Sequence, residues 1–309
     1  MYKDFEKTTL KQVLKNGPVT APTVFECISA RTVELCGYNS MVLSGRGMSY
    51  CMNGVPDIGL LNDEEVVYLT TRLTNYTSLP VIVDAGAFYG DDPSRVFLDC
   101  YRLVKAGADA IVITDASFFD GKDRAYDSSF VRAPVSGEIF FARIKAAVKA
   151  VEGSKCLVIA KSTADVDDAI NRIVEARKLG AGITCIEKAR TKSDAEKINA
   201  FDPGYKMWAG ISVVDGKCEV EPEQLHNLGY RIIVEDYAIK AAMFGMLYYG
   251  KRTLEDGNTV FHDTHTYDGL LKLGEDYHVL FSFWKKWLPM EDKFNDLSDV
   301  LSIEHEIKE

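Results

Sequence analysis

The sequence predicts an α/β protein, a closed (β/α)8 barrel of the TIM type, from two observations. Eight short apolar segments, each ending in a polar or charged residue, alternate along the chain with helical stretches. Buried parallel strands are near-continuous apolar runs, and eight such strand–helix units form this barrel. A glycine also follows four predicted helices just before the next strand, where a left-handed helix end favours glycine: Gly37, Gly107, Gly180 and Gly229.

The elements follow in order along the chain. The predicted strands are residues 23–26, 40–44, 80–84, 110–115, 156–161, 182–187, 206–212 and 230–235. The predicted helices are residues 29–36, 63–76, 94–106, 138–151, 165–179, 193–201, 222–228 and 237–249. Two connections, 45–62 and 116–137, are long, which is typical of binding loops or lids. We assign residues 1–250 to the barrel and 251–309 to a helical C-terminal extension that packs on the barrel or on a partner subunit.

Composition and charge exclude several classes of function. The 309 residues carry a net charge of −10 without a basic cluster, so we expect no nucleic-acid partner. No segment approaches the roughly 20 consecutive apolar residues of a membrane span, and the N-terminus lacks the apolar core of a signal peptide. Seven cysteines without CxxC spacing indicate reduced thiols, so we expect a cytoplasmic protein. A small anionic substrate would need a local cation to offset the overall charge.

The barrel predicts where the chemistry lies. Barrel enzymes place their sites at the C-terminal ends of the strands, which here carry Glu26, Ser44, Asp84, Asp115, Lys161, Glu187, Ser212 and Glu235. Asp84 is the best catalytic candidate, although an Asp there can also cap a helix or bond loop amides. Asp115 is either functional or loop-bonding. Lys161 is either a base or Schiff-base nucleophile, or a cation that pairs with Glu187 or Asp84 or binds a substrate carboxylate.

Several short motifs add a resemblance that runs from about residue 9 to residue 250. They are Ser29-Ala30-Arg31, Ser44-Gly45, Val55-Pro56-Asp57, the run from Pro80 to Ala85 with Tyr89-Gly90, and the run from Ile144 to Ala147. In their order and spacing they resemble the isocitrate lyase/phosphoenolpyruvate mutase superfamily. The resemblance implies Mg²⁺-assisted making or breaking of a C–C or P–C bond through an enolate-like intermediate. Family members also exchange their last barrel helix, which implies a homo-oligomer, either a dimer or a tetramer.

The resemblance implies roles for individual residues. Asp84 and Asp57 would hold Mg²⁺, largely through water. Ser44, Gly45 and Arg46 would hold the substrate carboxylate and oxyanion. We place Lys161, Glu187, Asp115 and Lys122 in the catalytic set, and Ser44, Gly45, Arg46, Tyr89 and Arg124 in the substrate-binding set. For Lys122 and Arg124 in the long loop, solvated loop charge is the alternative to closure over an anionic ligand.

The sequence also departs from the family pattern. The D-A-D run after the third strand is Asp84-Ala85-Gly86, and the E-D pair after the fourth is Thr114-Asp115. Lys161 replaces an arginine, which keeps the charge but loses the bidentate fork. The cysteine loop of the lyases has no counterpart, and Gly210 and Val213 stand where lyases place Asn and Glu. Glu187 matches the carboxylate of methylisocitrate lyases.

Together, these features predict a lyase- or mutase-type enzyme acting on a small α-oxo or α-hydroxy carboxylate through a Mg²⁺-stabilised enolate. Two alternatives stay open. One is a metal-independent barrel enzyme that uses Lys161, and the other is a non-catalytic binding or assembly relative of the superfamily.

Overall fold

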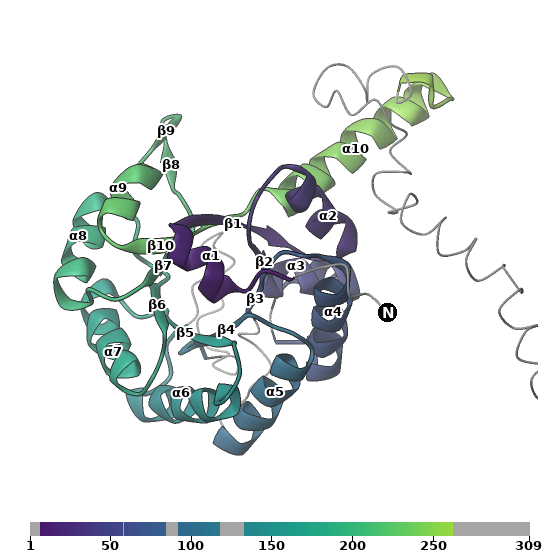
Figure 1. Cartoon of the computed structure of the whole chain (residues 1–309). Coiled ribbons are helices and arrows are strands. Elements are labelled where there is room, and N and C mark those ends of the chain that lie inside the picture. The colour runs from purple at the N-terminus through teal and green to yellow at the C-terminus, as the bar shows by residue number, and fades with distance from the viewer. Residues whose placement is uncertain (1–6, 58, 85–91, 118–132, 262–309) are drawn as a thin grey trace, which may run out of the picture. The chain divides into compact units, whose positions relative to one another are not determined.

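The computed structural model describes residues 7–57, 59–84, 92–117 and 133–261, and it confirms the predicted barrel (Figure 1). Eight parallel strands close in the order β1-β10-β7-β6-β5-β4-β3-β2. Their bounds are β1 (Val19–Val24), β2 (Met41–Leu43), β3 (Val81–Asp84), β4 (Ala110–Thr114), β5 (Leu157–Ser162), β6 (Ile183–Ile186), β7 (Lys206–Trp208) and β10 (Tyr230–Glu235). Closure comes from the pairing of β1 with β10, in register from Val19↔Ile232 to Pro22↔Glu235.

Helices surround the barrel, close to the predicted ranges (Figure 1). Those around the barrel are α2 (Cys27–Leu35), α4 (Asp63–Tyr76), α5 (Pro93–Lys105), α6 (Gly137–Val151), α7 (Val166–Lys178), α8 (Lys192–Phe201) and α9 (Pro222–Asn227), and α10 (Ala238–Asp256) follows the last strand. Asn62 caps α4 and Glu65 closes the capping box. The four repeated glycines have φ between 79° and 109°, which confirms the predicted left-handed helix ends.

Some local predictions were wrong. The first strand runs over Val19–Val24 rather than 23–26, with Pro22 inside it, and β7 ends at Trp208 rather than at residue 212. Five elements were not predicted: helix α1 (Leu10–Asn16), the short helix α3 (Gly45–Met48) with the π-helix η1 (Ser49–Asn53), and the two hairpin strands β8 (Val213–Val214) and β9 (Lys217–Cys218). The connection 45–62 is therefore partly helical.

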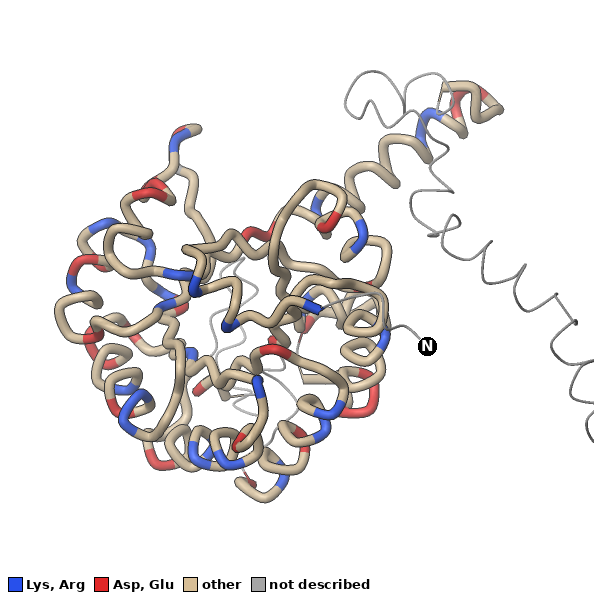
Figure 2. The backbone as a smooth tube through the Cα atoms, in the orientation of Figure 1, with Lys and Arg blue, Asp and Glu red and all other residues tan. Residues whose placement is uncertain are grey.

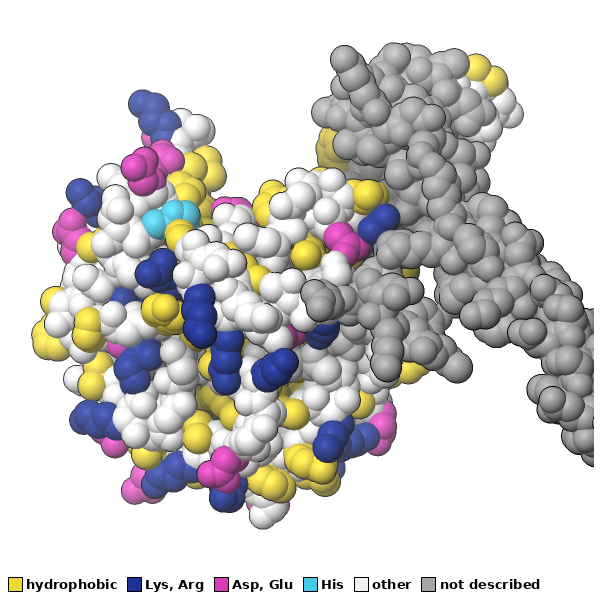
Figure 3. All heavy atoms as spheres, in the orientation of Figure 1, with side chains coloured by type: hydrophobic (Ala, Val, Ile, Leu, Met, Phe, Trp, Pro, Cys, Tyr) yellow, Lys and Arg dark blue, Asp and Glu magenta, His cyan; other side chains and the backbone are white. Residues whose placement is uncertain are grey.

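Helix α1 closes one end of the barrel. Leu10, Val13 and Leu14 are buried in one cluster with interior strand residues such as Val19 and Ile232. Its lysines Lys11 and Lys15 are exposed to solvent. Figure 3 shows several basic side chains on the face of the molecule that it draws. Because α1 packs at the N-terminal ends of the strands, the opposite, C-terminal mouth is the one left for a ligand.

The chain divides into two compact units, Met1–Met243 and Phe244–Glu309, and α10 runs through the division. Within the second unit, Phe261 packs against Tyr248 and Tyr249, with ring centroids 5.8 and 5.9 Å away. The packing role of residues 251–309 and the oligomeric state stay predictions. Among the described helices, none combines the length and the apolar composition that crossing a bilayer requires.

Candidate active site

Charged residues are rare in the barrel strands, which narrows the search for a site. Figure 2 shows most charges on the surrounding helices and loops. The charged residues within the eight barrel strands are Asp84, Lys161, Lys206, Arg231 and Glu235. Asp84 and Glu235 are the last residues of β3 and β10, and Lys161 is the second-last of β5. These three therefore lie at the C-terminal mouth, where the barrel places chemistry.

Asp84, Lys161 and Glu187 form an ion-paired cluster that we call the strand-end triad. The Lys161 ammonium donates to Asp84 Oδ2 at 2.9 Å and lies 3.5 Å from Glu187 Oε2. Glu187 follows β6, and its backbone N–H donates to the carbonyl of Ser162 in β5 at 2.8 Å. The three side chains are 27%, 15% and 28% exposed, so each is largely buried yet open to a ligand.

The charge state of Lys161 follows from this geometry. Burial alone would lower its pKa, but the carboxylates of Asp84 and Glu187 outweigh burial and raise the pKa above the ordinary value. A permanently protonated amine is a poor nucleophile. Of the two alternatives for Lys161, the geometry therefore supports charge pairing rather than a Schiff base.

A third carboxylate, that of Asp57, lies beside Gly45 and the backbone of Asp84. A Cβ built at Gly45 would lie 3.2 Å from the Asp84 carbonyl oxygen and 3.4 Å from Asp57 Oδ2, so a methyl group here would crowd both residues. This part of the chain holds three carboxylates, those of Asp57, Asp84 and Glu187, and one ammonium, that of Lys161. The sum of these charges is −2, which suits a divalent cation. Within the described ranges, no three His, Cys, Asp or Glu side chains are grouped to bind a metal. Mg²⁺ is usually held by one or two carboxylates and several waters, so a site here would rest on Asp57 and Asp84 with water completing the shell.

The predicted oxyanion segment begins helix α3. Ser44 is its N-cap, with its hydroxyl accepting from the Gly47 N–H at 3.2 Å. Gly45 and Arg46 are the first two helical residues, whose N–H groups have no acceptor within the helix. The Arg46 side chain is 57% exposed and lies 3.7 Å from Asp236. This helix start is thus suited to an anion through its backbone rather than through the Ser44 hydroxyl.

Asp115 lies in a different environment from Asp84. Its side chain is fully buried and accepts from Ser162 Oγ at 2.6 Å, Thr163 N at 2.7 Å and Thr163 Oγ1 at 2.9 Å. Arg172 lies 3.4 Å from the same carboxylate and donates to the carbonyl of Val135 at 2.8 Å. The structure therefore supports the loop-bonding alternative, in which Asp115 joins β4, β5 and the chain leading into α6.

The remaining predicted residues at strand ends, Glu26, Ser212 and Glu235, lie in different surroundings. Glu26 caps α2 by accepting from the N–H groups of Ile28 and Ser29, both at 2.6 Å. Ser212 lies beyond the end of β7, so its placement at a strand end was wrong. Burial raises the pKa of Glu235. Three predicted residues lie outside the described residues: Tyr89, Lys122 and Arg124.

The sequence reasoning missed Asp236, directly after β10. It accepts from Thr23 Oγ1 at 2.6 Å and pairs with Arg46, so it belongs to the same mouth. The signal was available, because Glu235 and Asp236 together end the last apolar strand.

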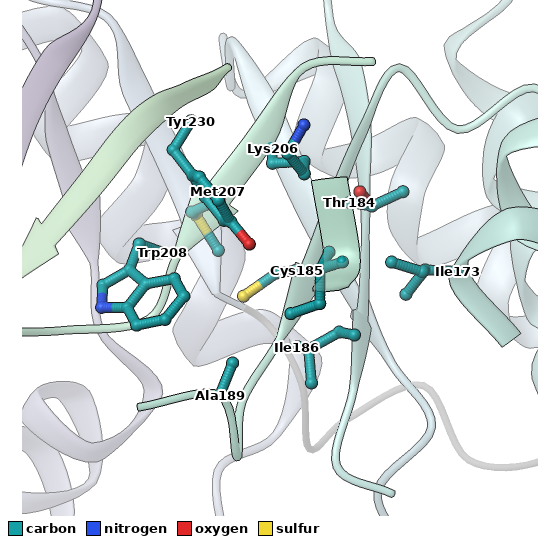
Figure 4. A pocket seen from close by; sticks show the side chains of 10 residues that line it. Ile173, Thr184, Cys185, Ile186, Ala189, Lys206, Met207, Trp208 and Tyr230 are labelled. Atoms are coloured by element: carbon teal, nitrogen blue, oxygen red, sulfur yellow. The ribbon is translucent and has the colours of Figure 1, made fainter. Parts of the chain in front are cut away.

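Lys206, at the start of β7, belongs to the layer between the barrel and its helices. It is 1% exposed and lines a small pocket with Trp208 and Tyr230 (Figure 4). Its ammonium donates to Asn199 Oδ1 and to the carbonyls of Asp202 and Gly204, at 2.9 to 3.0 Å. Burial lowers its pKa to about 8, with the carboxylate of Asp202 opposing. It lies at the other end of its strand from the candidate site.

The family model described as phosphoenolpyruvate phosphomutase matches residues 10–251. The chain is 26% identical over 303 residues to the petal death protein of Dianthus caryophyllus, covering 94% of this chain and 90% of that one. It is 33% identical over 207 residues to an oxaloacetate decarboxylase of Paraburkholderia xenovorans, covering 65% of this chain and 67% of that one. The crystal structure of 2,3-dimethylmalate lyase matches with a TM-score of 0.77 at 21% identity, covering 93% of this chain and 99% of that one.

Proposed function

The chain belongs to the phosphoenolpyruvate mutase/isocitrate lyase superfamily, and from this premise we propose that it is a lyase or mutase acting on a small α-oxo or α-hydroxy carboxylate. The superfamily consists of enzymes that make or break C–C or P–C bonds, and its members generally use Mg²⁺. The names of an oxaloacetate decarboxylase and a 2,3-dimethylmalate lyase among its relatives support a small carboxylate substrate.

The observation that carries the proposal is the strand-end triad beside Asp57 and Gly45. It collects three carboxylates and one ammonium at the C-terminal mouth of the barrel. Surplus negative charge repels an anionic substrate unless a cation joins the site. A site of this charge therefore suits an anion that enters together with a divalent ion.

Asp84 and Asp57 would hold Mg²⁺, whose charge, when bound, stabilises an oxygen that becomes negative. The N–H groups of Gly45 and Arg46 donate to the substrate carboxylate, as their place at the start of α3 allows. Lys161 fixes the positions of Asp84 and Glu187 through its two ion pairs. Glu187 then orients the part of the substrate beyond the reacting carbons. Contributions of Tyr89, Lys122 and Arg124 remain part of the proposal.

A ligand-dependent unfolding experiment tests this function. We expect oxalate, which mimics a pyruvate enolate, to raise the Tm of the full chain when Mg²⁺ is present. Asp84→Asn should reduce that rise, because it removes a metal-binding charge. Asp168→Asn, on the exposed side of α7, serves as the matched control and should keep it. Equal Tm values with and without oxalate and Mg²⁺ would contradict the proposal.

A further inference from the structure

We propose that the N-terminal end of the barrel carries a second binding site, which takes a phosphate monoester with a compact apolar group. The site is a cavity of about 430 Å³ lined by α1, α6, the start of β5 and the residues that follow α7. Small-molecule pockets commonly have volumes of about 300–1,000 Å³. The inference goes beyond the proposed function, because this cavity and the strand-end triad lie at opposite ends of the barrel.

Strand β5 runs between the two ends. Its first two residues, Leu157 and Val158, line the cavity, whereas Lys161 near its end belongs to the triad. The step from Leu157 to Lys161 covers about 13 Å, at a rise of about 3.3 Å per residue. The residues that line the cavity include none of the candidate active site, so the two sites can bind separate ligands.

The cavity is positively charged in a chain whose net charge is −10. Three lysines line it, Lys11 from α1 and Lys145 and Lys149 from α6, together with one carboxylate, that of Glu152. Lys149 pairs with Glu152 at 2.5 Å. Within the part of the chain that the structure describes, Lys11 and Lys145 form no ion pair, so two positive charges remain for a ligand. Figure 3 shows basic side chains on the face where Figure 1 places α1.

The positions of these lysines in their helices point to a ligand. A lysine in the last turn of a helix often serves to offset the helix dipole, and Lys149 in the last turn of α6 fits that role. Lys145 comes before the last turn of α6. Lys11 lies in the first turn of α1, where the helix dipole disfavours a cation. Two ammonium groups from different helices that line one cavity instead suit a doubly charged anion, such as the phosphate of a monoester.

The cavity also has apolar walls. They include Val148, Val151 and Leu179, together with Cys156, which is 5% exposed. Burial raises the pKa of Cys156 to about 12, so its thiol is neutral at pH 7 and contributes apolar surface. An apolar group of the ligand can pack on these side chains while its phosphate faces the two ammonium groups. Inorganic phosphate alone would lack the apolar contact.

Titration calorimetry on the full chain tests the inference, with phenyl phosphate as the probe. The buffer contains EDTA, so that no Mg²⁺ draws an anion to the other end of the barrel. We expect saturable binding that weakens as salt is added, because charge attraction contributes to it. Phenol and inorganic phosphate should each bind about tenfold more weakly or less, since each lacks one of the two contacts.

Three lysine variants locate the bound probe. Lys11→Met and Lys145→Met each remove one ammonium group and should lower the affinity for phenyl phosphate about tenfold. Both lysines are exposed, so we expect both variants to keep the wild-type Tm. Lys192→Met is the matched control, because this lysine of α8 pairs with Glu196 outside the cavity, and it should keep the wild-type affinity.

Three results would overturn the inference. The first is that wild-type protein does not bind phenyl phosphate. The second is that Lys11→Met and Lys145→Met bind it as tightly as Lys192→Met does, which would place the probe elsewhere. The third is that inorganic phosphate binds as tightly as phenyl phosphate, because the apolar walls would then contribute nothing.

Discussion

The buried ammonium of Lys206 should make the stability of this barrel rise with pH in the alkaline range. In the folded chain its pKa is about 8, whereas the ordinary value is 10.5, which we take for the unfolded chain. Between these values the unfolded state holds a proton that the folded state has released. Stability increases with pH wherever the unfolded state binds more protons, so the sign is positive.

The magnitude follows from the same two values. Over the whole range from below pH 8 to above pH 10.5, Lys206 should raise the free energy of unfolding by about 3 kcal/mol, since a pKa difference of 1 corresponds to about 1.4 kcal/mol. From pH 8 to pH 10, the contribution of Lys206 to the free energy of unfolding should increase by about 2 kcal/mol.

Urea unfolding at several pH values measures this contribution by difference. Other groups titrate in the same range, so the wild type is compared with Lys206→Met, which lacks the amine. Lys178→Met, a lysine on the surface of α7 that is 67% exposed, should keep the wild-type slope. Parallel slopes for wild type and Lys206→Met between pH 8 and pH 10 would refute the reasoning.

Two further predictions concern the candidate site. Asp115→Ala should lower the free energy of unfolding by about 3–5 kcal/mol, because it leaves Arg172, Ser162 and Thr163 without their buried acceptor. The control is Asp168→Ala, which removes the exposed partner of the same Arg172. It should lower the free energy of unfolding by about 1 kcal/mol or less. Chemical denaturation compares the two, and wild-type stability together with lost ligand binding in Asp115→Ala would instead favour the catalytic alternative. Gly45→Ala should lower the free energy of unfolding by about 1–3 kcal/mol, because the added methyl group crowds the Asp84 carbonyl and Asp57. It should also reduce the rise in Tm that oxalate causes in the presence of Mg²⁺. Gly250→Ala in α10 meets no atom within 4 Å and is the control, and an unchanged oxalate response in Gly45→Ala would count against the close approach.

The sequence predicted the barrel well because its signals are local. Apolar runs and the glycines after helices depend on neighbouring residues alone. All four glycines were confirmed, as were the strands except for the position of the first and the end of the seventh. The first strand was misplaced because Pro22, which usually marks an edge or a break, lies inside β1. Helix α1 had a readable signal, since Thr9 and Gln12 form a capping box.

The site was harder to predict than the fold. Asp84 and Asp115 both end apolar runs, and nothing in their local sequence separates them. The difference arises from β5, where Lys161 points to Asp84 while Ser162 and Thr163 bond Asp115. Such pairings depend on how neighbouring strands align around the barrel, which local sequence patterns do not encode.

The joint between β1 and β10 has a consequence for how the chain folds. Thr23 and Asp236, hydrogen-bonded across this joint, are 213 residues apart, so the ring can close only after almost the whole barrel sequence is available. Contacts of such sequence separation require a large loss of chain entropy and slow folding. Until β10 arrives, β1 and β7 are open strand edges that can pair with other chains. During synthesis the last barrel strand therefore decides whether the chain closes on itself or associates with others.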